Sequence, residues 1–458
     1  MFQASLIPVL VCRWLAILAI AWLGFSTVQA KESVVVMTSF GKEVTSAYKA
    51  RFEANFPLFS VEFINVPTTS AVSLLRDRRE GARPDVFWSS APEAFDVLAR
   101  LNYLTKAGEL GDPLIPAKIG NFDVNDPLGF FKGQALSGYG IMWNTRYMKA
   151  KNLPLPQDWS DLGNPVYFGH LIMTSPSRSG TTHLIVEAIL QTYGWEEGWR
   201  QLLLIGGNCG EISERSFGVP DGVNRGHYGL GPVIDFLGLA GKNTGFPVDF
   251  IYPRKNAVFP ANIAIIEGAK NPLGARKFVS YALSQEGQSI LLRPEISRFP
   301  VLPSVFANNI APAGIPNLYE VIRNTTLKFD RSISERRYRI VSSMFDQLIT
   351  FRHVELKRAI KRIIEAENLL SKRHNPEATA LAVKARAMIL FVPVSEAQIL
   401  NPEFVQELSA RHHTSGGHMK LAELERRLAR DIKENYLESE MLAQRAITLA
   451  NTSAGSTP

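Results

Sequence analysis

The sequence has 458 residues, two cysteines and a formal net charge of +7 at pH 7. Residues 31–324 are almost neutral, with 28 Lys and Arg against 27 Asp and Glu, whereas residues 325–458 hold 21 against 16. A nucleic-acid partner is not expected, because it would require a basic face with interleaved aromatic residues. The basic surplus fits a docking surface for an acidic partner or an anionic membrane, while an ordinary solvated helix face is the simpler alternative.

The first thirty residues have the pattern of a secretory signal peptide. Arg13 is their only charged residue, an apolar run follows it, and the small residue Ala30 precedes the expected cleavage site. The expected location is therefore the periplasm, with an uncleaved membrane anchor as the alternative. Cleavage would remove Cys12 and leave Cys209 as a single cysteine, expected to be a small buried residue. Without a disulfide, a large hydrophobic core must hold the chain together.

Strand and helix patterns alternate three times between Lys31 and about Ala135. Strands are expected at 34–37, 61–66 and 85–88, and helices at 44–56, 72–75 and 95–101. The connecting loops hold Thr38, Ser39 and Phe40 in the first unit, Ser70 in the second, and Ser89 and Ser90 in the third. In an open, mostly parallel sheet such loops share the carboxyl edge, where ligands bind. The alternative, in which each hydroxyl only caps its own helix, explains every loop singly but not their shared edge.

The stretch Met173–His183 carries the strongest signal for a ligand. An apolar strand pattern over 167–173 precedes it and an amphipathic helix follows it, so Ser179, Gly180, Thr181 and Thr182 stand at a helix start. Unpaired N–H groups and the helix dipole favour an anion there. Arg178 adds a planar cation that can bind a phosphate or carboxylate through two hydrogen bonds. The sequence predicts half of an anion-binding site, with an ordinary capped helix and a solvent-facing arginine as the alternative.

Further candidates follow in the same part of the chain. A strand is expected at 134–144, and the proline-rich stretch 153–159 is read as a connection into a second domain. Arg215 and Ser216 repeat the arginine–hydroxyl pairing, which favours a doubly charged anion over a neutral sugar. Asp235 ends a strand and either accepts a hydrogen bond from a ligand hydroxyl or pairs with a neighbouring arginine. His183 either contacts a ligand phosphate or caps its helix.

The segment 268–288 carries a family resemblance. Gly268-Ala269-Lys270-Asn271-Pro272, followed by a helix expected from Leu273 to Leu291 that contains Leu283-Ser284-Gln285-Glu286-Gly287-Gln288, resembles the bacterial extracellular solute-binding proteins of the ferric-iron/phosphonate type. The resemblance covers about 34–299. It implies an α/β, two-lobed type II periplasmic binding fold with a long helical C-terminal extension. The implied parts are lobe 1 at 31–136 and 258–324, lobe 2 at 137–257, and the extension at 325–458.

The same resemblance implies a function. The ligand loops of the family map onto the Thr38–Phe40, Ser70, Ser89–Ser90 and Arg178–Thr182 positions, and iron is not expected because the chain lacks the Tyr-Tyr pair of the ferric members. Residues 175–184, 216–219 and 231–235 look closest to members that regulate phosphoglycerate transport. The implied function is a periplasmic receptor for a small phosphorylated organic acid, phosphoglycerate or phosphoenolpyruvate, acting with the periplasmic domain of a membrane sensor kinase. The alternative is the binding component of an ABC importer, with a permease as partner, for another anion such as a phosphonate or sugar phosphate.

Enzymatic activity, a cofactor and a metal are not expected. The sequence has no Gly-x-Ser-x-Gly elbow, no Walker loop and no His-Glu-x-x-His motif. His412, His413 and His418 lie in a polar stretch, with adventitious metal binding as the less favoured reading. Past Pro303, helical apolar patterns over 341–370 and 421–436 predict helices that pack on the lobes and on each other, or that present a surface to a sensor.

Overall fold

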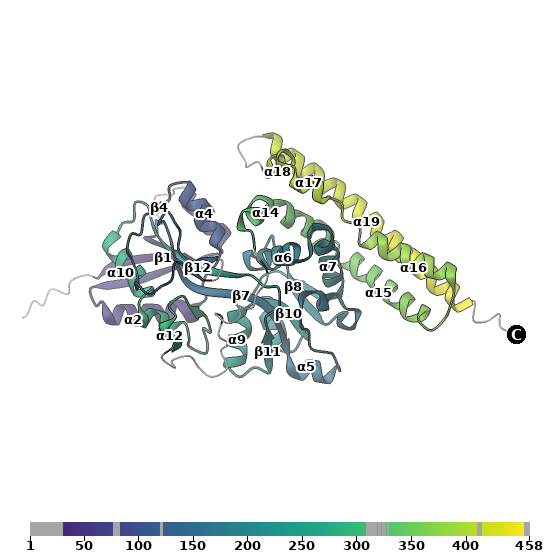
Figure 1. The fold of residues 1–458 in the computed structure, drawn as a ribbon, viewed down its shortest axis with the longest axis horizontal. Helices are drawn as coiled ribbons and strands as arrows, with labels where there is room; N and C mark the ends of the chain where they lie inside the picture. The colour runs from purple at the N-terminus through teal and green to yellow at the C-terminus, as the bar shows by residue number, and fades with distance from the viewer. Residues whose placement is uncertain are drawn as a thin grey trace, which may run out of the picture.

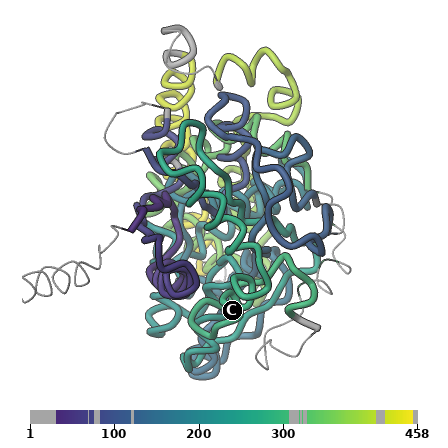
Figure 2. Tube along the Cα trace, turned by 90° about the vertical axis from the view of Figure 1, so that its left-hand side faces the viewer, coloured from purple at the N-terminus to yellow at the C-terminus, as the bar shows by residue number. Residues whose placement is uncertain are grey.

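The computed structural model describes residues 31–76, 83–119, 122–307, 318, 322, 327, 329–409 and 415–452. The predicted signal peptide lies outside these residues. The described chain forms two α/β lobes and a helical C-terminal extension, and Figure 1 shows the extension at the opposite end of the molecule from the first lobe. Viewed from the first lobe, most of the extension lies behind the lobes, and one end of it, in yellow-green and yellow, rises above them (Figure 2). No helix of this described part combines the length and the apolarity needed to cross a membrane.

The first lobe is built from the three predicted strand–helix units. Strands β1 and β2 pair in parallel, as do β1 and β3, and β12 joins β3 in the antiparallel sense. The elements are β1 (Glu32–Thr38), α2 (Lys42–Asn55), β2 (Phe59–Asn65), α3 (Thr68–Arg76), β3 (Val86–Ser89), α4 (Pro92–Arg100), β4 (Leu104–Thr105), β5 (Lys118–Ile119), β6 (Phe122–Asp123) and β12 (Val258–Ile266). The parallel order brings the carboxyl ends of β1 and β3 to the same edge of the sheet.

Strand β7 (Lys132–Asn144) runs through both lobes (Figure 1). Its first half pairs with β12 as far as Gly138, and from Tyr139 onward it pairs with β10 (Leu230–Ile234). Gly140 allows β11 (Val248–Ile251) to approach, because a side chain there would collide with the Ile251 carbonyl. The change of partner at 138–139 supports the boundaries that we propose for the lobes, 31–136 with 258–324 and 137–257, and for the extension, 325–458.

The second lobe continues the sheet with β10, β8 and β9 in that order. Its elements are α5 (Thr145–Ala150), η1 (Trp159–Gly163), η2 (Pro165–Tyr167), β8 (Leu171–Thr174), α6 (Gly180–Tyr193), α7 (Trp195–Asn208), β9 (Cys209–Ser213), α8 (Gly218–Asn224) and α9 (Asp235–Asn243). The strand predicted over 167–173 begins only at Leu171, because Pro165–Tyr167 forms a 3-10 helix and residues 168–170 form a turn.

The chain then returns to the first lobe through α10 (Pro272–Ala282), α11 (Gln285–Ile290), β13 (Phe299–Pro300) and α12 (Ser304–Ala307). The single helix predicted from Leu273 to Leu291 is two helices. Ser284 causes the break, because its Oγ accepts a hydrogen bond from the Gly287 N–H at 3.2 Å and so caps a new helix.

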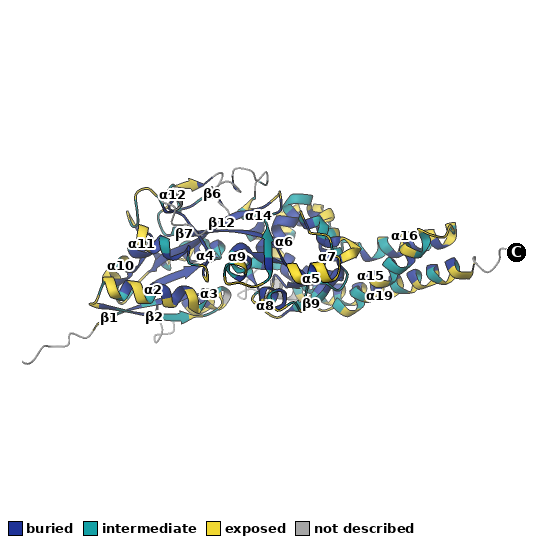
Figure 3. Ribbon diagram, turned by 90° about the horizontal axis from the view of Figure 1, so that it is seen from below, coloured by how far each residue is buried: buried dark blue, intermediate teal, exposed yellow. Residues whose placement is uncertain are grey.

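The extension consists of α14 (Arg331–Phe345), a π-turn (Asp346–Thr350), α15 (His353–Leu370), α16 (Pro376–Ile389), α17 (Glu396–Leu400), α18 (Pro402–Ser409) and α19 (Ser415–Thr452). Many of its apolar residues, such as Ile340 and Tyr436, belong to the same hydrophobic core as those of α6 and α7 in the second lobe, while a separate cluster that includes Ala382 and Ala446 joins α16 to α19. Gly206 and Gly207 of α7 leave room for Ile349 and Ile360, since a Cβ on either glycine would lie within 2.7 Å of those side chains. The prediction that the tail helices pack on a lobe is confirmed, and Figure 3 shows their buried faces turned inward.

Helix α14 also contacts the first lobe. Its Arg331 pairs with Asp96 of α4 at 2.6 Å, and its Glu335 pairs with Arg100 of the same helix. On the other side, Arg337 of α14 pairs with Glu187 of α6. The start of the extension therefore bridges a helix of each lobe.

Candidate ligand-binding site

Hydroxyl groups from all three loops of the first lobe meet at the edge of its sheet. The Oγ atoms of Ser39 and Ser89 lie 3.0 Å apart, and Thr68 Oγ1 lies 2.7 Å from Ser89 Oγ. Thr38 is fully buried, and its Oγ1 accepts a hydrogen bond from the Phe40 N–H at 3.1 Å, which fixes the loop after β1. The predicted shared edge is thus present in the geometry.

Of the other two predicted residues of the first lobe, Ser90 lies next to this cluster and Ser70 lies on the surface. Ser90 is half-buried and follows Ser89 directly, before α4 begins. Ser70 is exposed within the first turn of α3, because the helix begins at Thr68 and not after Ser70. The second loop therefore contributes Thr68 to the hydroxyl cluster in place of Ser70.

The start of α6 has the predicted strand–loop–helix form. Ser179 is the N-cap, and its Oγ accepts a hydrogen bond from the Thr182 N–H at 3.2 Å. The N–H groups of Gly180 and Thr181 lie in the first turn, where helix geometry provides no intrahelical acceptor and the dipole is positive. An anion at this place would accept hydrogen bonds from these two N–H groups.

Arg178 lies directly before this helix start. Its Nη1 is 3.1 Å from Glu214 Oε1 and donates a long hydrogen bond of 3.5 Å to the Ser213 carbonyl. The arginine side chain is 26% exposed and the glutamate side chain 84%, so the ion pair is weak and can be exchanged for a ligand. Arg215 is exposed and Ser216 half-buried in the loop after β9, which lies beside β8 in the sheet. The two arginine–hydroxyl pairs therefore follow neighbouring strands.

The two lobes touch where these loops face each other. A Cβ built on Gly180 would lie 3.9 Å from the Cβ of Ala91, which follows Ser90 in the first lobe. The starts of α4 and α6 therefore approach each other closely, with room for little more than one methyl group between Gly180 and Ala91. This approach brings the Ser89–Ser90 and Ser179–Gly180 positions together across the junction of the lobes.

Asp235 is fully buried at the start of α9. Its Oδ2 accepts hydrogen bonds from the Gly138 N–H at 2.6 Å and the Tyr252 hydroxyl at 3.0 Å, and its Oδ1 accepts one from the Phe236 N–H at 2.7 Å. Burial raises the pKa of this carboxyl to about 7. The charge of Arg298 acts to lower this pKa, although no ion pair joins the two side chains among the described residues. The hydrogen bonds of the carboxylate hold α9 to β7 at the crossover between the lobes, and both roles that the sequence left open, the ligand hydroxyl and the arginine partner, stay predictions.

Arg298 was not predicted from the sequence. It precedes β13, is 3% exposed, and its Cζ lies 4.0 Å from the ring centre of Phe40 and 3.6 Å from that of Phe236. Its Nε and Nη1 atoms are buried without a hydrogen-bond partner. Burial lowers the pKa of this guanidinium to about 9. The available signal was a lone charge in the apolar run Ile296–Leu302.

His183 has a different environment from either one predicted. Its Nε2 lies 3.1 Å from Ser334 Oγ and its ring centre lies 4.1 Å from that of Tyr338, both on α14. The histidine neither caps α6 nor faces the hydroxyl cluster, because α14 covers this face of α6. Burial lowers its pKa to about 4, so it is neutral at physiological pH.

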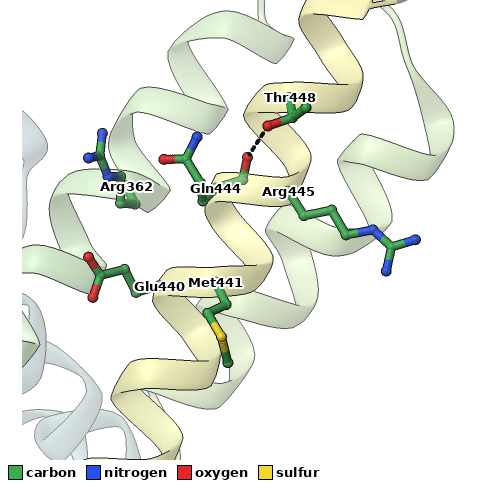
Figure 4. Close-up of a pocket in the computed structure, with 6 residues that line it drawn as sticks. All are labelled: Arg362, Glu440, Met441, Gln444, Arg445 and Thr448. Carbon is green, nitrogen blue, oxygen red and sulfur yellow. Dashed lines mark hydrogen bonds between the residues drawn. The ribbon is translucent and has the colours of Figure 1, made fainter.

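Other potential sites lie away from these residues. Among the described residues, no group of three or more His, Cys, Asp or Glu side chains could hold a metal ion. The histidines predicted as a polar stretch lie outside the side chains that the structure describes. A pocket of about 470 Å³ in the extension, shown in Figure 4, is lined by Arg362, Glu440, Met441, Gln444, Arg445 and Thr448. None of the ligand-binding residues predicted from the sequence lines this pocket.

Comparison with known proteins agrees with this architecture. The family described as "Bacterial extracellular solute-binding protein" matches residues 82–316. The phosphoglycerate transport regulatory protein PgtC of Salmonella typhimurium is 33% identical over 378 residues, which cover 81% of this chain and 89% of PgtC.

Solved structures show the same fold. The periplasmic binding protein AfuA from Actinobacillus pleuropneumoniae aligns with a TM-score of 0.60 at 18% identity, over 69% of this chain and 98% of AfuA. The periplasmic binding protein P5PA aligns with a TM-score of 0.56 at 20% identity, over 71% of this chain and all of P5PA. The predicted two-lobed periplasmic binding fold is confirmed, and the chain belongs to the bacterial extracellular solute-binding protein family.

Proposed function

We propose that this protein is a periplasmic receptor for a small phosphorylated organic acid, phosphoglycerate or phosphoenolpyruvate. The observation that supports the proposal is the close approach of Gly180, at the start of α6, to Ala91, which lies two residues after Ser89 of the Ser39, Thr68 and Ser89 hydroxyl cluster. A phosphate at this place would accept hydrogen bonds from hydroxyls of the first lobe and from N–H groups of α6, with Arg178 supplying charge. Contacts to both lobes favour the closed arrangement, so binding and closure are coupled.

The similarity to PgtC supports the ligand class. The match covers 81% of the chain, which is more than the 324 residues before the extension, so it reaches into the extension as well. We therefore propose a regulatory role for this protein, in which it acts with the periplasmic domain of a membrane sensor kinase. The signal-peptide pattern of residues 1–30 supports export to the periplasm.

Calorimetric titration of the protein purified from the periplasm tests the ligand class. We expect binding of 3-phosphoglycerate, 2-phosphoglycerate or phosphoenolpyruvate, and none of glucose 6-phosphate or ferric citrate. Arg178→Gln should weaken binding about 10- to 100-fold, the value of a charge-assisted hydrogen bond. Arg225→Gln is the matched control, because Arg225 also forms a surface ion pair in the second lobe, with Asp221 at 2.8 Å. Equal affinities of the two variants would contradict the proposed site.

The sensor partnership is tested separately in cells. We expect phosphoglycerate-induced expression of its transporter to be lost when the gene for this protein is deleted and restored by the wild-type gene. Unchanged induction, together with loss of ligand uptake through an ATP-driven permease, would favour the importer role.

A further inference from the structure

Arg298 lies at the junction of the lobes and is held there by one aromatic ring from each. Phe40 belongs to the loop after β1 in the first lobe, and Phe236 belongs to the start of α9 in the second lobe. The guanidinium carbon is 4.0 Å and 3.6 Å from the two ring centres, a distance at which a cation interacts with both ring faces. With rings on its faces, the guanidinium has only its edges left for hydrogen bonds.

The guanidinium of Arg298 forms no ion pair among the described residues, although the charge of Asp235 acts on it from a distance. The Nε and Nη1 atoms make no hydrogen bond. A guanidinium has two donor edges, Nε with Nη2 and Nη1 with Nη2, so each edge of Arg298 has at least one unused donor. Asp235 is the nearby carboxylate, but its oxygens already accept hydrogen bonds from Gly138, Tyr252 and Phe236. Buried charges in proteins are normally paired, so an unpaired guanidinium at a ligand-binding junction indicates that an anion completes it.

The position of Arg298 relative to the hydroxyl cluster suggests which anion. Phe40, which stacks on Arg298, is the neighbour of Ser39 in the cluster. The guanidinium therefore lies beside the proposed phosphate position without being part of it. Its planar edge matches a carboxylate, which accepts two parallel hydrogen bonds in the guanidinium plane.

We propose that Arg298 binds the carboxylate of the phosphorylated acid, edge-on between Phe40 and Phe236, while the phosphate occupies the start of α6 near Arg178. This inference rests on the proposed function and deepens it, because it makes the receptor selective for ligands that carry both groups. It also links selectivity to closure, since the two rings that hold the guanidinium come from different lobes.

The test compares two ligands that differ at the carboxylate. 3-Phosphoglycerate has a carboxylate where glycerol 3-phosphate has a hydroxymethyl group. We expect the wild-type protein to prefer 3-phosphoglycerate, and Arg298→Gln to reduce that preference about 10- to 100-fold by weakening 3-phosphoglycerate binding alone. Arg178→Gln should weaken both ligands and retain the preference. Arg293→Gln, a half-buried arginine five residues earlier, is the control and should change neither.

Thermal unfolding of the ligand-free proteins separates a binding role from a structural one. Removing an unpaired buried charge should leave the unfolding temperature of Arg298→Met equal to that of the wild type or higher. If Arg298→Gln does not fold, Arg298→Lys keeps the charge without the planar fork and should still lose most of the preference. The inference is overturned if the Arg298 variants still prefer 3-phosphoglycerate to glycerol 3-phosphate as strongly as the wild type does. It is also overturned if they bind both ligands equally more weakly and unfold at a lower temperature, because that result indicates a structural role. A wild-type protein that binds no phosphorylated acid overturns the proposed function as well.

Discussion

The ion pair between Arg337 and Glu187 is a buried polar contact between the extension and the second lobe. Arg337 Nε and Nη2 each lie 2.7 Å from a Glu187 oxygen, in a parallel bidentate arrangement. The glutamate side chain is 0% exposed and the arginine side chain 11%. Replacing Arg337 with Met leaves the buried carboxylate without its cation, and breaking a buried pair in this way costs about 3–5 kcal/mol.

This cost can be measured as a shift in the unfolding temperature. The entropy of unfolding is about 2.1 cal/mol/K per residue, or about 0.9 kcal/mol/K for a chain of this length, so Arg337→Met should unfold about 3–6 °C lower. Scanning calorimetry of the wild type and variant at one pH gives the value. Adding Glu187→Leu removes the unpaired carboxylate and should recover most of the loss.

The control for this prediction is an exposed ion pair of the same extension. Arg445 Nη2 lies 3.8 Å from Glu377 Oε1, and the two side chains are 66% and 67% exposed. Arg445→Met should cost about 0–1 kcal/mol, because water and salt screen such pairs. If Arg337→Met were no more destabilising than Arg445→Met, the buried ion pair would not anchor the extension on α6.

Three further predictions concern burial and close packing. Burial raises the pKa of Glu93 from 4.5 to about 7, so the folded state holds this proton more tightly than the unfolded state and loses stability as the pH rises through that range. Between pH 5 and 8 the unfolding temperature of Glu93→Gln should therefore fall less than that of the wild type, and an equal fall would contradict this. Burial raises the pKa of the Cys209 thiol to about 12, so the folded protein should not react with a thiol reagent at pH 8 until urea unfolds it; fast labelling of the folded protein would refute this. Gly207→Ala would place a Cβ 2.6 Å from Ile360 Cγ1 and should cost about 1–3 kcal/mol in urea unfolding. Ile360→Ala is destabilising by itself because it leaves a cavity, but the cost of Gly207→Ala should be smaller in the Ile360→Ala background than in the wild type, and an equal cost would show that the loss is not steric.

The strand–helix units and the hydroxyl loops could be predicted because both depend on local sequence. The spacing of apolar residues along the sequence predicts β1, α2 and α6. Ser179 caps α6 at the helix start that the sequence predicts. Boundaries were less predictable. Ser70 was assigned to a loop because the helical apolar pattern is clear only from Val72, but α3 begins at Thr68, directly after Pro67.

Residues whose role depends on distant parts of the chain could not be predicted. His183 lies under α14, and its partner Ser334 is 151 residues away in sequence. Arg298 is held by Phe40 and Phe236, which come from different lobes and meet only after the chain has crossed between them. No spacing rule along the sequence relates these residues, so only the assembled lobes reveal them.

A crystal structure of the protein with 3-phosphoglycerate would show whether one phosphorylated acid binds at the junction of the lobes. We predict a phosphate within hydrogen-bond distance of the Gly180 and Thr181 N–H groups and of the Ser39 and Ser89 hydroxyls, with the lobes closed over it. A ligand bound elsewhere, for example in the extension pocket lined by Arg362 and Arg445, or a ligand that contacts one lobe only, would show that the junction of the lobes is not the binding site.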